Sequence, residues 1–360
     1  MKNNSIKTMI GVACILLAAV LFVAPALAQS FGKTIDVIYR DIKIYIDGSL
    51  VVPKDASGRI VEPFIHNGTT YLPARAISEA LGKTVEWDGV NNNIYIGELV
   101  SQDIVEIAVS TAEEFVAALG SNRRILLNEG LYNLSEVSPA YINSSNVSFI
   151  ESYDGVELTL NGVHNLTIQG AGKNKSELVI TPRYAFVMKF EDCSNIAINN
   201  IKAGHTPERG YCAGGVFSFE DSMDIQIDNT DMYGCGTVGL HLALVANMKV
   251  TNSTVYDCTE GIVAAYNCAK IMFKDCVFKD NHAFTMVKVW MTHGFSIDSC
   301  EFSNNSAEYY PDAVFSVEGS YNVAVTNTLF ENNAAAMLFE QSVIELDESN
   351  TFKNNTFTSK

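Results

Sequence analysis

The chain has 360 residues, with 41 acidic side chains against 24 lysines and arginines, so its formal net charge is −17. This charge argues against nucleic acid as a partner, because phosphate polyanions bind basic surfaces. The length allows two or three domains. Beyond residue 28, no stretch of the sequence is long and apolar enough to span a bilayer.

The N-terminus has the pattern of an export signal. Two lysines precede an uncharged apolar run from Thr8 to Ala24, and Ala26-Leu27-Ala28 offers small residues at the positions that a signal peptidase reads. We therefore expect residues 1–28 to be removed and the mature protein to be secreted or cell-surface associated, outside the cytoplasm. The alternative is an uncleaved membrane anchor, although the apolar run is short for a spanning helix.

Residues 29–40 are expected to form a linker, and residues 41–99 a small α+β domain. Alternating apolar residues predict short strands, and Asn67-Gly68 between two of them is a strong hairpin signal. A helix is predicted from Pro73 to Leu81, because proline suits the first turn and the glycine that follows ends the helix.

This domain resembles the stalk called the copper amine oxidase N-terminal domain-like domain, which is frequent in secreted proteins of Gram-positive bacteria. The resemblance rests on Asn-Gly-Thr-x-x-x-Pro-x-Arg over residues 67–75 and Gly-x-x-Val-x-Trp over residues 82–87. It implies a stalk without copper or a quinone cofactor, and nothing in the chain resembles the catalytic domain of an amine oxidase. We expect Arg75 to make a structural ion pair or hydrogen bond and Trp87 to pack in the core.

Residues 100–144 are expected to be a linker and a cap. Ser110 and Glu113 form a capping-box pattern at the start of a short amphipathic helix, and a strand pattern follows at residues 124–127. A helix and strand in this order resemble the cap that begins many right-handed parallel β-helices. Such a cap covers the apolar end and the unpaired edge of the first coil.

Residues 145–360 carry a ragged internal repeat that predicts a solenoid. Each unit of roughly 22–28 residues opens with alternating apolar residues and holds three short strands. The clearest units are Met223–Val245, Ala246–Cys268, Ala269–Thr292, His293–Ser320 and Tyr321–Ser342.

Columns of similar residues give the repeat its register. The third strand of each unit is expected to turn two apolar rows inward, which begin at Met188 and Phe190 and end at Met337 and Phe339. Two polar columns in the turns are interpreted as structural ladders, because stacked amides satisfy one another. One column is Asn200, Asn229, Asn252, Asp275, Ser299 and Asn327, and the other is Cys235, Cys258, Asn281, Asn305 and Asn333.

Stacked cysteines leave a choice between buried thiols and disulfides. Cys235 is expected over Cys258, and Cys276 over Cys300. Coils stack ~4.8 Å apart, and Cβ atoms at that separation lie beyond the ~3.5–4.5 Å of a disulfide. We favour free thiols, and disulfides stay the alternative.

The coil pattern resembles the right-handed parallel β-helix superfamily, which includes pectate lyases and many surface proteins. The resemblance implies an all-β dominated fold, a right-handed parallel β-helix with an N-terminal capping helix, preceded by the small α+β stalk domain. It also implies that a substrate groove, where there is one, lies on the sheet of the third strands.

The outward positions of the third strands form two columns of candidate site residues. Aromatic rings flanked by polar groups on a flat β-surface suit the faces of sugar rings, so we expect ligand binding at Trp290, Tyr266, His241 and Glu220. Lys288 is a catalytic candidate beside them. The alternative is that a loop covers Trp290 and its ring only packs. The columns are Lys189, Ser218, His241, Ala264, Lys288 and Ser316, and Glu191, Glu220, Ala243, Tyr266, Trp290, Glu318 and Glu340.

The long loop Gly204–Gly215 interrupts one coil just before the third strand and holds further candidates. Glu208 is a candidate base or metal ligand, His205 a candidate general acid and Arg209 a candidate partner for a substrate carboxylate. Cys212 with His205 would supply only two metal ligands, so no metal site is predicted. The alternative is a loop braced by one Glu–Arg pair.

Complete catalytic patterns are missing from the sequence. Asn229-Thr230-Asp231 resembles one motif of the polygalacturonase family, but the paired aspartates and the Arg-x-Lys that accompany it are missing. Glu191 and Glu220 near Lys189 fall short of the calcium-binding carboxylate cluster of a pectate lyase. No cofactor is therefore predicted, and Ca²⁺ would enter only if the protein were a lyase.

Three functions stay open. The first is a non-catalytic carbohydrate- or envelope-binding scaffold whose partner is an extracellular or cell-wall polysaccharide. The second is a polysaccharide lyase or glycoside hydrolase that acts on an acidic or neutral extracellular polysaccharide between the loop and the Trp290 face. The third is a purely structural or adhesive repeat. The aromatic pair and the incomplete catalytic set favour the first.

Overall fold

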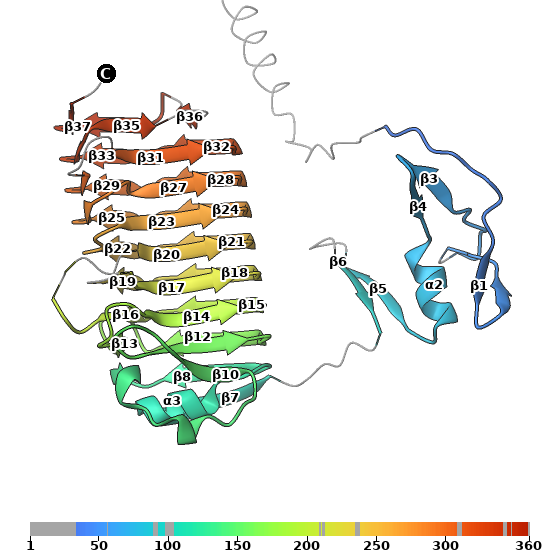
Figure 1. Cartoon of the computed structure of the whole chain (residues 1–360), viewed down its shortest axis with the longest axis horizontal. Helices are drawn as coiled ribbons and strands as arrows, with labels where there is room; N and C mark the ends of the chain where they lie inside the picture. The colour runs from blue at the N-terminus through green and yellow to red at the C-terminus, as the bar shows by residue number, and fades with distance from the viewer. Residues whose placement is uncertain are drawn as a thin grey trace, which may run out of the picture. The chain divides into compact units, whose positions relative to one another are not determined.

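A computed structural model describes residues 34–55, 57–88, 93–97, 104–208, 210, 213–234, 238–307, 312–340, 344–346 and 348–358. The chain divides after Ser101 into two compact units (Figure 1), which are described separately. The expected signal peptide, residues 1–28, lies outside the described residues. Within the part of the chain that is described, every helix is too short or too polar to cross a membrane.

The first unit contains hairpins and the helix α2 (Ala74–Ala80). Asp47-Gly48 and Asn67-Gly68 each have positive φ at both residues, as a type I′ hairpin turn requires. Pro73 precedes α2 and Gly82 follows it with φ of 75°, so the helix begins and ends as expected. The hairpins pair β1 (Ile44–Ile46) with β2 (Ser49–Val51), β3 (Phe64–His66) with β4 (Thr69–Tyr71), and β5 (Val85–Asp88) with β6 (Asn93–Ile96).

Two expectations about side chains in this unit have different outcomes. Arg75 is structural, since its guanidinium donates to the Val85 carbonyl at 2.8 Å and lies 3.4 Å from the Glu79 carboxylate. The expectation that Trp87 packs in a core is wrong, because its side chain is 56% exposed. Among the described strands β5 pairs only with β6, and a two-stranded hairpin leaves a face open to solvent.

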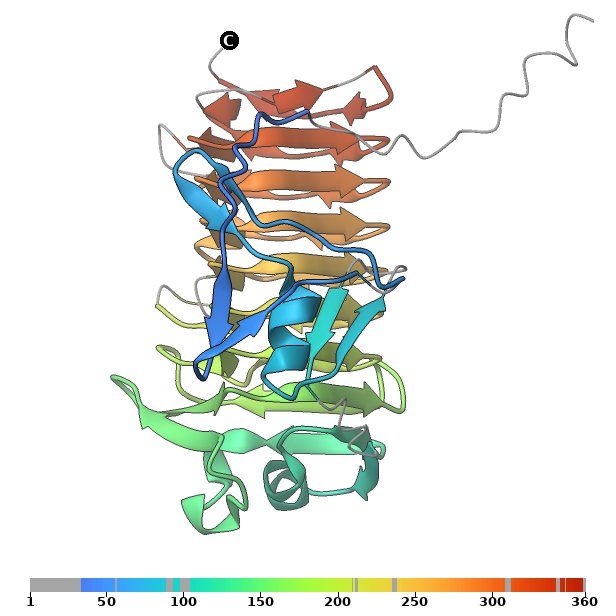
Figure 2. The same cartoon turned by 90° about the vertical axis from the view of Figure 1, so that its right-hand side faces the viewer.

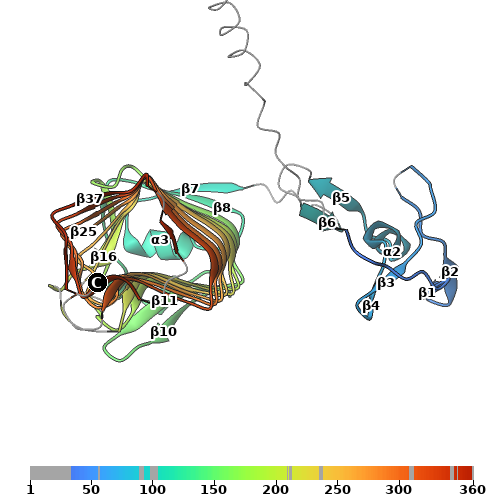
Figure 3. The same ribbon diagram turned by 90° about the horizontal axis from the view of Figure 1, so that it is seen from above.

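The second unit begins with a capping helix, as expected. Helix α3 (Ala112–Ala118) lies across the end of the coils and buries Phe115 and Val116 (Figure 3). The capping box lies one residue later than predicted: Thr111 is the N-cap and accepts from the Glu114 amide at 3.2 Å, while the Glu114 carboxylate accepts from the Ser110 amide at 2.7 Å. Two 3₁₀ turns follow, η1 (Leu134–Glu136) and η2 (Pro139–Tyr141).

Three long sheets wind around the second unit, one for each strand of the repeat (Figures 1 and 2). The first-strand sheet contains β7 (Val105–Val109), β8 (Arg123–Leu127), β12 (His164–Gly170), β15 (Ser194–Asn199), β18 (Met223–Asp228), β21 (Ala246–Thr251), β24 (Ala269–Lys274), β28 (His293–Asp298), β32 (Tyr321–Thr326) and β36 (Ile344–Leu346). The second-strand sheet contains β9 (Gly130–Asn133), β13 (Ser176–Ile180), β16 (Lys202–His205), β19 (Asp231–Tyr233), β22 (Thr254–Tyr256), β25 (Val277–Lys279), β29 (Glu301–Ser303), β33 (Leu329–Glu331) and β37 (Thr351–Lys353). The third-strand sheet contains β10 (Val147–Glu151), β11 (Val156–Asn161), β14 (Phe186–Glu191), β17 (Gly215–Glu220), β20 (Val238–Ala243), β23 (Gly261–Tyr266), β27 (Val287–Trp290), β31 (Ala313–Glu318) and β35 (Met337–Glu340).

The repeat is regular, with two departures that the sequence did not predict. The third-strand sheet starts with an antiparallel pair, β10 and β11, before the parallel pairing begins between β11 and β14. The later coils add a short fourth strand, and these strands form a sheet of their own. They are β26 (His282–Ala283), β30 (Ser306–Ala307), β34 (Ala334–Ala335) and β38 (Thr356–Phe357).

The two inward rows of the third-strand sheet fill the core from Met188 and Phe190 onward, as expected. The prediction fails only in the last coil, where it set Met337 against Phe315. In the structure Phe339 pairs with Phe315, and Glu340 therefore pairs with Ser316 and not with Glu318. A slip of two residues keeps the same side chains inward, so the alternation alone cannot detect it.

The two predicted ladders have different outcomes. In the first column Asn229 donates to Asn200, but Asn252 and Asn327 donate to Asp228 and Asp298, both at 2.8 Å, so these amides do not pair along the column.

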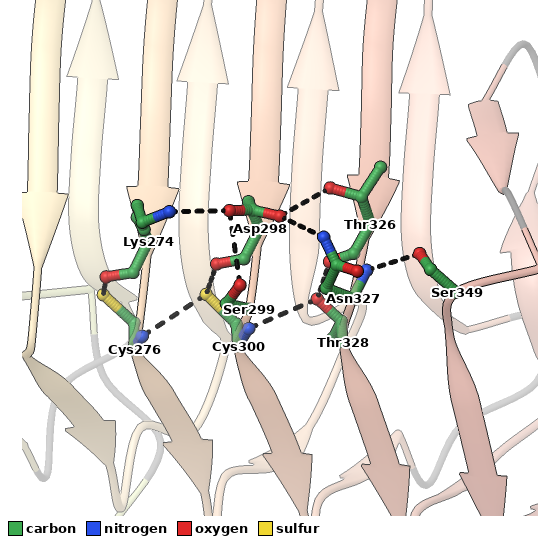
Figure 4. A network of polar contacts seen from close by, with 9 residues as sticks. All are labelled: Lys274, Cys276, Asp298, Ser299, Cys300, Thr326, Asn327, Thr328 and Ser349. Carbon is green, nitrogen blue, oxygen red and sulfur yellow. Dashed lines mark hydrogen bonds and ion pairs between the residues drawn. The ribbon is translucent and has the colours of Figure 1, made fainter. Parts of the chain in front are cut away.

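The second column is a hydrogen-bonded ladder. Asn281, Asn305 and Asn333 are buried, and each side chain donates to the amide oxygen of the next member at 2.9–3.0 Å. Cys276 and Cys300 stack as free thiols, with the Cys276 amide donating to the Cys300 sulfur at 3.4 Å (Figure 4). Cys235 lies outside the described residues.

Candidate functional site

A shallow pocket of about 280 Å³ lies on the outer face of the third-strand sheet. It exists because small residues stand between large ones along the outward column: Ala264 separates His241 from Lys288 on neighbouring strands. The lining residues come from β14, β20, β23 and β27 and from the loops before β17, β23 and β27. They are Phe186, Ala213, Val238, His241, Glu260, Gly261, Val263, Ala264, Tyr266, Thr285 and Lys288.

Four rings follow one another along this face, and we call them the ring row: Phe186, His241, Tyr266 and Trp290. Their neighbouring centroids lie 5.9, 5.8 and 6.4 Å apart. Trp290 is 42% exposed, so no loop among the described residues covers it fully. The ring row therefore ends in an exposed ring, Trp290, and its other three rings are half-buried.

A charged cluster adjoins the ring row toward the cap. The Lys189 ammonium lies 2.8 Å from Glu191 and 3.1 Å from Glu220, on two neighbouring strands. These carboxylates satisfy the lysine, and hydrogen bonds and charge from both raise the pKa of Lys189 against the opposing effect of burial. Glu157 lies next to the cluster, and its pKa is raised because burial penalises the carboxylate. With one lysine against two glutamates, the cluster is negative in sum.

His241 links the charged cluster to the pocket. Its Nδ1 lies 3.2 Å from the Ser218 hydroxyl, and that hydroxyl donates to Glu220 at 3.4 Å. Burial lowers the pKa of His241, so the imidazole is neutral at pH 7. Of the ligand-binding residues expected from sequence, Glu220, His241, Tyr266 and Trp290 thus lie together.

Lys288 lies on the other side of the pocket from the charged cluster. Its ammonium is 3.9 Å from the Glu260 carboxylate, a loose pair at a half-exposed position. Burial and the charge of Glu260 raise the pKa of the Tyr266 hydroxyl. The pocket therefore offers a protonated phenol, an ammonium and a neutral imidazole.

The other catalytic candidates do not join this site. His205 is only 3% exposed in β16, where its Nε2 donates to the Ala185 carbonyl at 3.1 Å and its Nδ1 has no partner among the described residues. Glu208 is exposed, and Arg209 and Cys212 lie outside the described residues. His205 is thus shielded from a polymer on the surface.

The long loop reaches the pocket through Ala213. It is held at two points: the Thr259 hydroxyl donates to the Gly210 carbonyl at 2.7 Å, and the Gly214 amide donates to the Arg183 carbonyl at 3.0 Å. Gly214 has no room for a side chain, because a Cβ would lie 2.3 Å from the Ala185 carbonyl oxygen. Ala213 of this loop thus lines the pocket, whereas the described residues His205 and Glu208 do not.

Sequence reasoning missed a second aromatic cluster on the second-strand sheet. Tyr233 and Tyr256 stack with centroids 5.5 Å apart, and Lys202 lies 4.4 Å above the Tyr233 ring. The Tyr233 hydroxyl donates to Glu177 at 2.6 Å, so this end of the cluster is already satisfied. The spacing of one coil between the two tyrosines was a signal that could have found the pair.

No group of three or more His, Cys, Asp or Glu side chains within the described ranges is arranged to hold a metal ion. The carboxylates beside the ring row are instead engaged by lysine.

Two family models match the chain. Residues 130–286 and 214–360 match the right-handed β-helix region, and residues 46–116 match the copper amine oxidase N-terminal domain. These matches confirm both resemblances that the sequence motifs indicated. No curated protein matches the chain.

Several solved structures share the fold at low identity. An alginate lyase from Paenibacillus sp. str. FPU-7 is 12% identical with a TM-score of 0.46, over 69% of this chain and 95% of the lyase. A pectate lyase from Bacillus sp. N165, solved with trigalacturonate, is 14% identical with a TM-score of 0.45, over 72% of this chain and 85% of the lyase. A polygalacturonase from Erwinia carotovora ssp. carotovora is 11% identical with a TM-score of 0.39, over 71% of this chain and 94% of that enzyme.

At these identities the likeness concerns the fold alone. The matches to the right-handed β-helix model together span residues 130–360, more than half of the sequence. The chain therefore belongs to the right-handed β-helix family and carries a copper amine oxidase N-terminal domain ahead of the β-helix.

Proposed function

We propose that this protein is a cell-surface scaffold that binds an extracellular or cell-wall polysaccharide along the ring row. The observation that carries the proposal is the row itself, with rings on β14, β20, β23 and β27 at centroid separations of 5.8–6.4 Å. A row of half-buried rings that ends in an exposed tryptophan is typical of a binding surface.

A polysaccharide suits this surface because both are repetitive. Coils stack ~4.8 Å apart, so a polymer that lies along the β-helix axis crosses one strand at each step and meets the rings on β14, β20, β23 and β27 in turn. Pyranose rings pack their C–H faces on aromatic rings, and their hydroxyls can pair with Glu260, Thr285 and Lys288 at the pocket.

The charges favour a neutral glycan over an acidic one. Lys189 is paired with Glu191 and Glu220, and Lys288 lies near Glu260. The chain as a whole carries a formal charge of −17, which would repel a polyanion. A neutral polysaccharide of the cell wall or matrix is therefore the ligand class that we favour.

The proposal includes export of the protein and a separate role for each segment of the chain. Residues 1–28 would be removed on secretion, and residues 29–40 would link the new N-terminus to a stalk at residues 41–99. Residues 100–144 would link and cap the β-helix, and residues 145–360 would carry the ring row. The stalk then serves as a spacer or an anchor outside the cytoplasm.

The test is a glycan array followed by titration of the best neutral ligand. Trp290→Ala should weaken binding about tenfold, or about 1.4 kcal/mol, because exposed aromatic anchors dominate such surfaces. Tyr321→Ala is the matched control, since Tyr321 is an exposed aromatic residue on the first-strand sheet, stacked on His293 at 4.1 Å. The proposal fails if no glycan binds, or if both variants weaken binding equally.

A further inference from the structure

Four polar side chains beside the pocket contact one another in series, from Lys189 to His241. The Lys189 ammonium lies 3.1 Å from Oε1 of Glu220, and the Ser218 hydroxyl donates to the same oxygen at 3.4 Å. Nδ1 of His241 lies 3.2 Å from the Ser218 hydroxyl oxygen. Ser218 is fully buried, so water does not compete for these contacts.

The donor and acceptor roles of these four groups determine which ring nitrogen of His241 carries the proton. The Glu220 carboxylate is paired with Lys189, so it is ionised and can only accept hydrogen bonds. The Ser218 hydroxyl has a single hydrogen, with Nδ1 of His241 at 3.2 Å and the Glu220 carboxylate at 3.4 Å. We assign the hydrogen to Glu220, because a charged carboxylate is a stronger acceptor than a neutral imidazole. Toward His241 the serine oxygen can therefore only accept, which requires the proton of a neutral imidazole to sit on Nδ1.

The other ring nitrogen is left as an acceptor. Nε2 is the nitrogen farther from the backbone, and the side chain points outward from β20 into the wall of the pocket. Among the described residues Nε2 has no hydrogen-bond partner. The flanking rings of Phe186 and Tyr266, at 5.9 and 5.8 Å, hold the imidazole in place.

We propose that His241 determines specificity at this pocket by presenting an unprotonated Nε2 to the ligand, so that the site selects a group that donates a hydrogen bond. For a polysaccharide that group is a ring hydroxyl. The same lone pair is positioned to take a proton from a bound ligand, which a protonated Nε2 could not do. The nature of the ligand rests on the proposed function, whereas the tautomer does not.

This arrangement makes binding dependent on pH. Burial lowers the pKa of His241, while Glu220 acts to raise it and Lys189 to lower it further. Protonation adds a hydrogen to Nε2, so binding should be full above this pKa and lost as the pH falls through it. The other charged and titratable groups around the ring are Glu157, Glu260, Tyr266 and Lys288.

The tautomer can be measured without any ligand. Nitrogen-15 NMR of histidine-labelled full-length protein at pH 7.5 distinguishes Nδ1–H from Nε2–H, and His241→Gln identifies the signal. We expect Nδ1–H in the wild type. In Ser218→Ala the acceptor is gone and the signal should shift toward Nε2–H, whereas Ser316→Ala, in the same outward column, should leave it unchanged.

A second variant covers the possibility that Ser218→Ala does not fold. Glu220→Ala frees the serine hydroxyl to donate to Nδ1, so the tautomer should again shift toward Nε2–H. An Nε2–H tautomer in the wild type would overturn the proposal. So would an Nδ1–H tautomer that neither variant changes.

Binding supplies a separate readout. With the best ligand from the array, His241→Phe keeps a ring but removes the acceptor, so we expect about tenfold weaker binding that no longer changes between pH 5 and pH 8. If no glycan binds while the wild type has the Nδ1–H tautomer, the proposed ligand class fails but the prepared acceptor stands. If a glycan binds and His241→Phe has no effect, the specificity role is refuted.

Discussion

Asp298 shows how single outward side chains join successive coils. Its carboxylate accepts from Asn327 at 2.8 Å, from Thr326 at 2.8 Å and from Lys274 at 3.0 Å, and these partners lie on the coils before and after it (Figure 4). The hydrogen bonds from Asn327, Lys274 and Thr326 lower the pKa of Asp298 to about 2. The ionised form therefore stabilises the fold.

The direction of the pKa shift determines the pH range over which Asp298 stabilises the fold. Because the folded pKa lies below the ordinary value of 3.8, the contribution is complete above that value and is lost as the pH falls toward about 2. Asp298→Asn should lower the free energy of unfolding at pH 6 by up to about 1 kcal/mol, since the pair with Lys274 is partly exposed. The difference from wild type should shrink near pH 2.

Urea unfolding at the two pH values checks this prediction. Asp221→Asn, at an exposed turn with φ of 48°, controls for the substitution itself. A difference between Asp298→Asn and wild type that is the same at both pH values would contradict the account.

For single residues, the sequence predicted on which face of a strand a side chain lies better than it predicted which residues that side chain contacts. The period of two placed His241, Tyr266 and Trp290 outward on neighbouring strands, because alternation is a local property of a strand. The partnership of His241 with Ser218 could not be predicted, since it depends on rotamers across two coils. The expectation that Trp87 packs in a core is wrong because the pattern of a single strand does not show whether another layer covers it.

The asparagine ladder shows how an element of the fold stabilises itself. The Asn305 side chain donates to the Phe278 carbonyl at 2.8 Å and to Asn333 at 2.9 Å. Its oxygen accepts both the backbone amide and the side-chain amide of Asn281, at 3.1 and 3.0 Å. Both polar atoms of the buried Asn305 side chain are thereby satisfied by the neighbouring coils.

Asn305→Ala should therefore be costly. It removes both the donors and the acceptor, and leaves buried groups of the neighbouring coils unsatisfied, so the free energy of unfolding should fall by about 3 kcal/mol. Asn174→Ala is the control at an exposed position, where a change within about 0.5 kcal/mol is expected. Equal urea midpoints for the two variants would show that the ladder adds little to stability.

The sequence predicted elements well wherever the chain repeats. Three strands per coil and the ladder columns follow from spacing, because each coil must meet the one before it in register. The antiparallel start at β10 and β11 could not be predicted, since an isolated coil end has no neighbour to compare. The two-residue slip at Met337 escaped because it preserves the alternation.

On the scale of the molecule, the repeated coils of the β-helix stack to form one continuous outer surface. The rigid core, with its inward rows and its ladders, holds the ring row at fixed spacing. If the row is a polysaccharide site, a longer oligosaccharide should contact more rings than a shorter one. The proposed function therefore predicts that the affinity for an oligosaccharide depends on its length.

The most direct measurement is calorimetric titration of a neutral oligosaccharide series against wild-type protein and a Tyr266→Ala/Trp290→Ala double variant. The account predicts that wild-type affinity rises with chain length until the row from Phe186 to Trp290 is covered and then levels off, and that the double variant loses this dependence on length. An affinity that is independent of length, or a double variant that behaves as the wild type does, would contradict it.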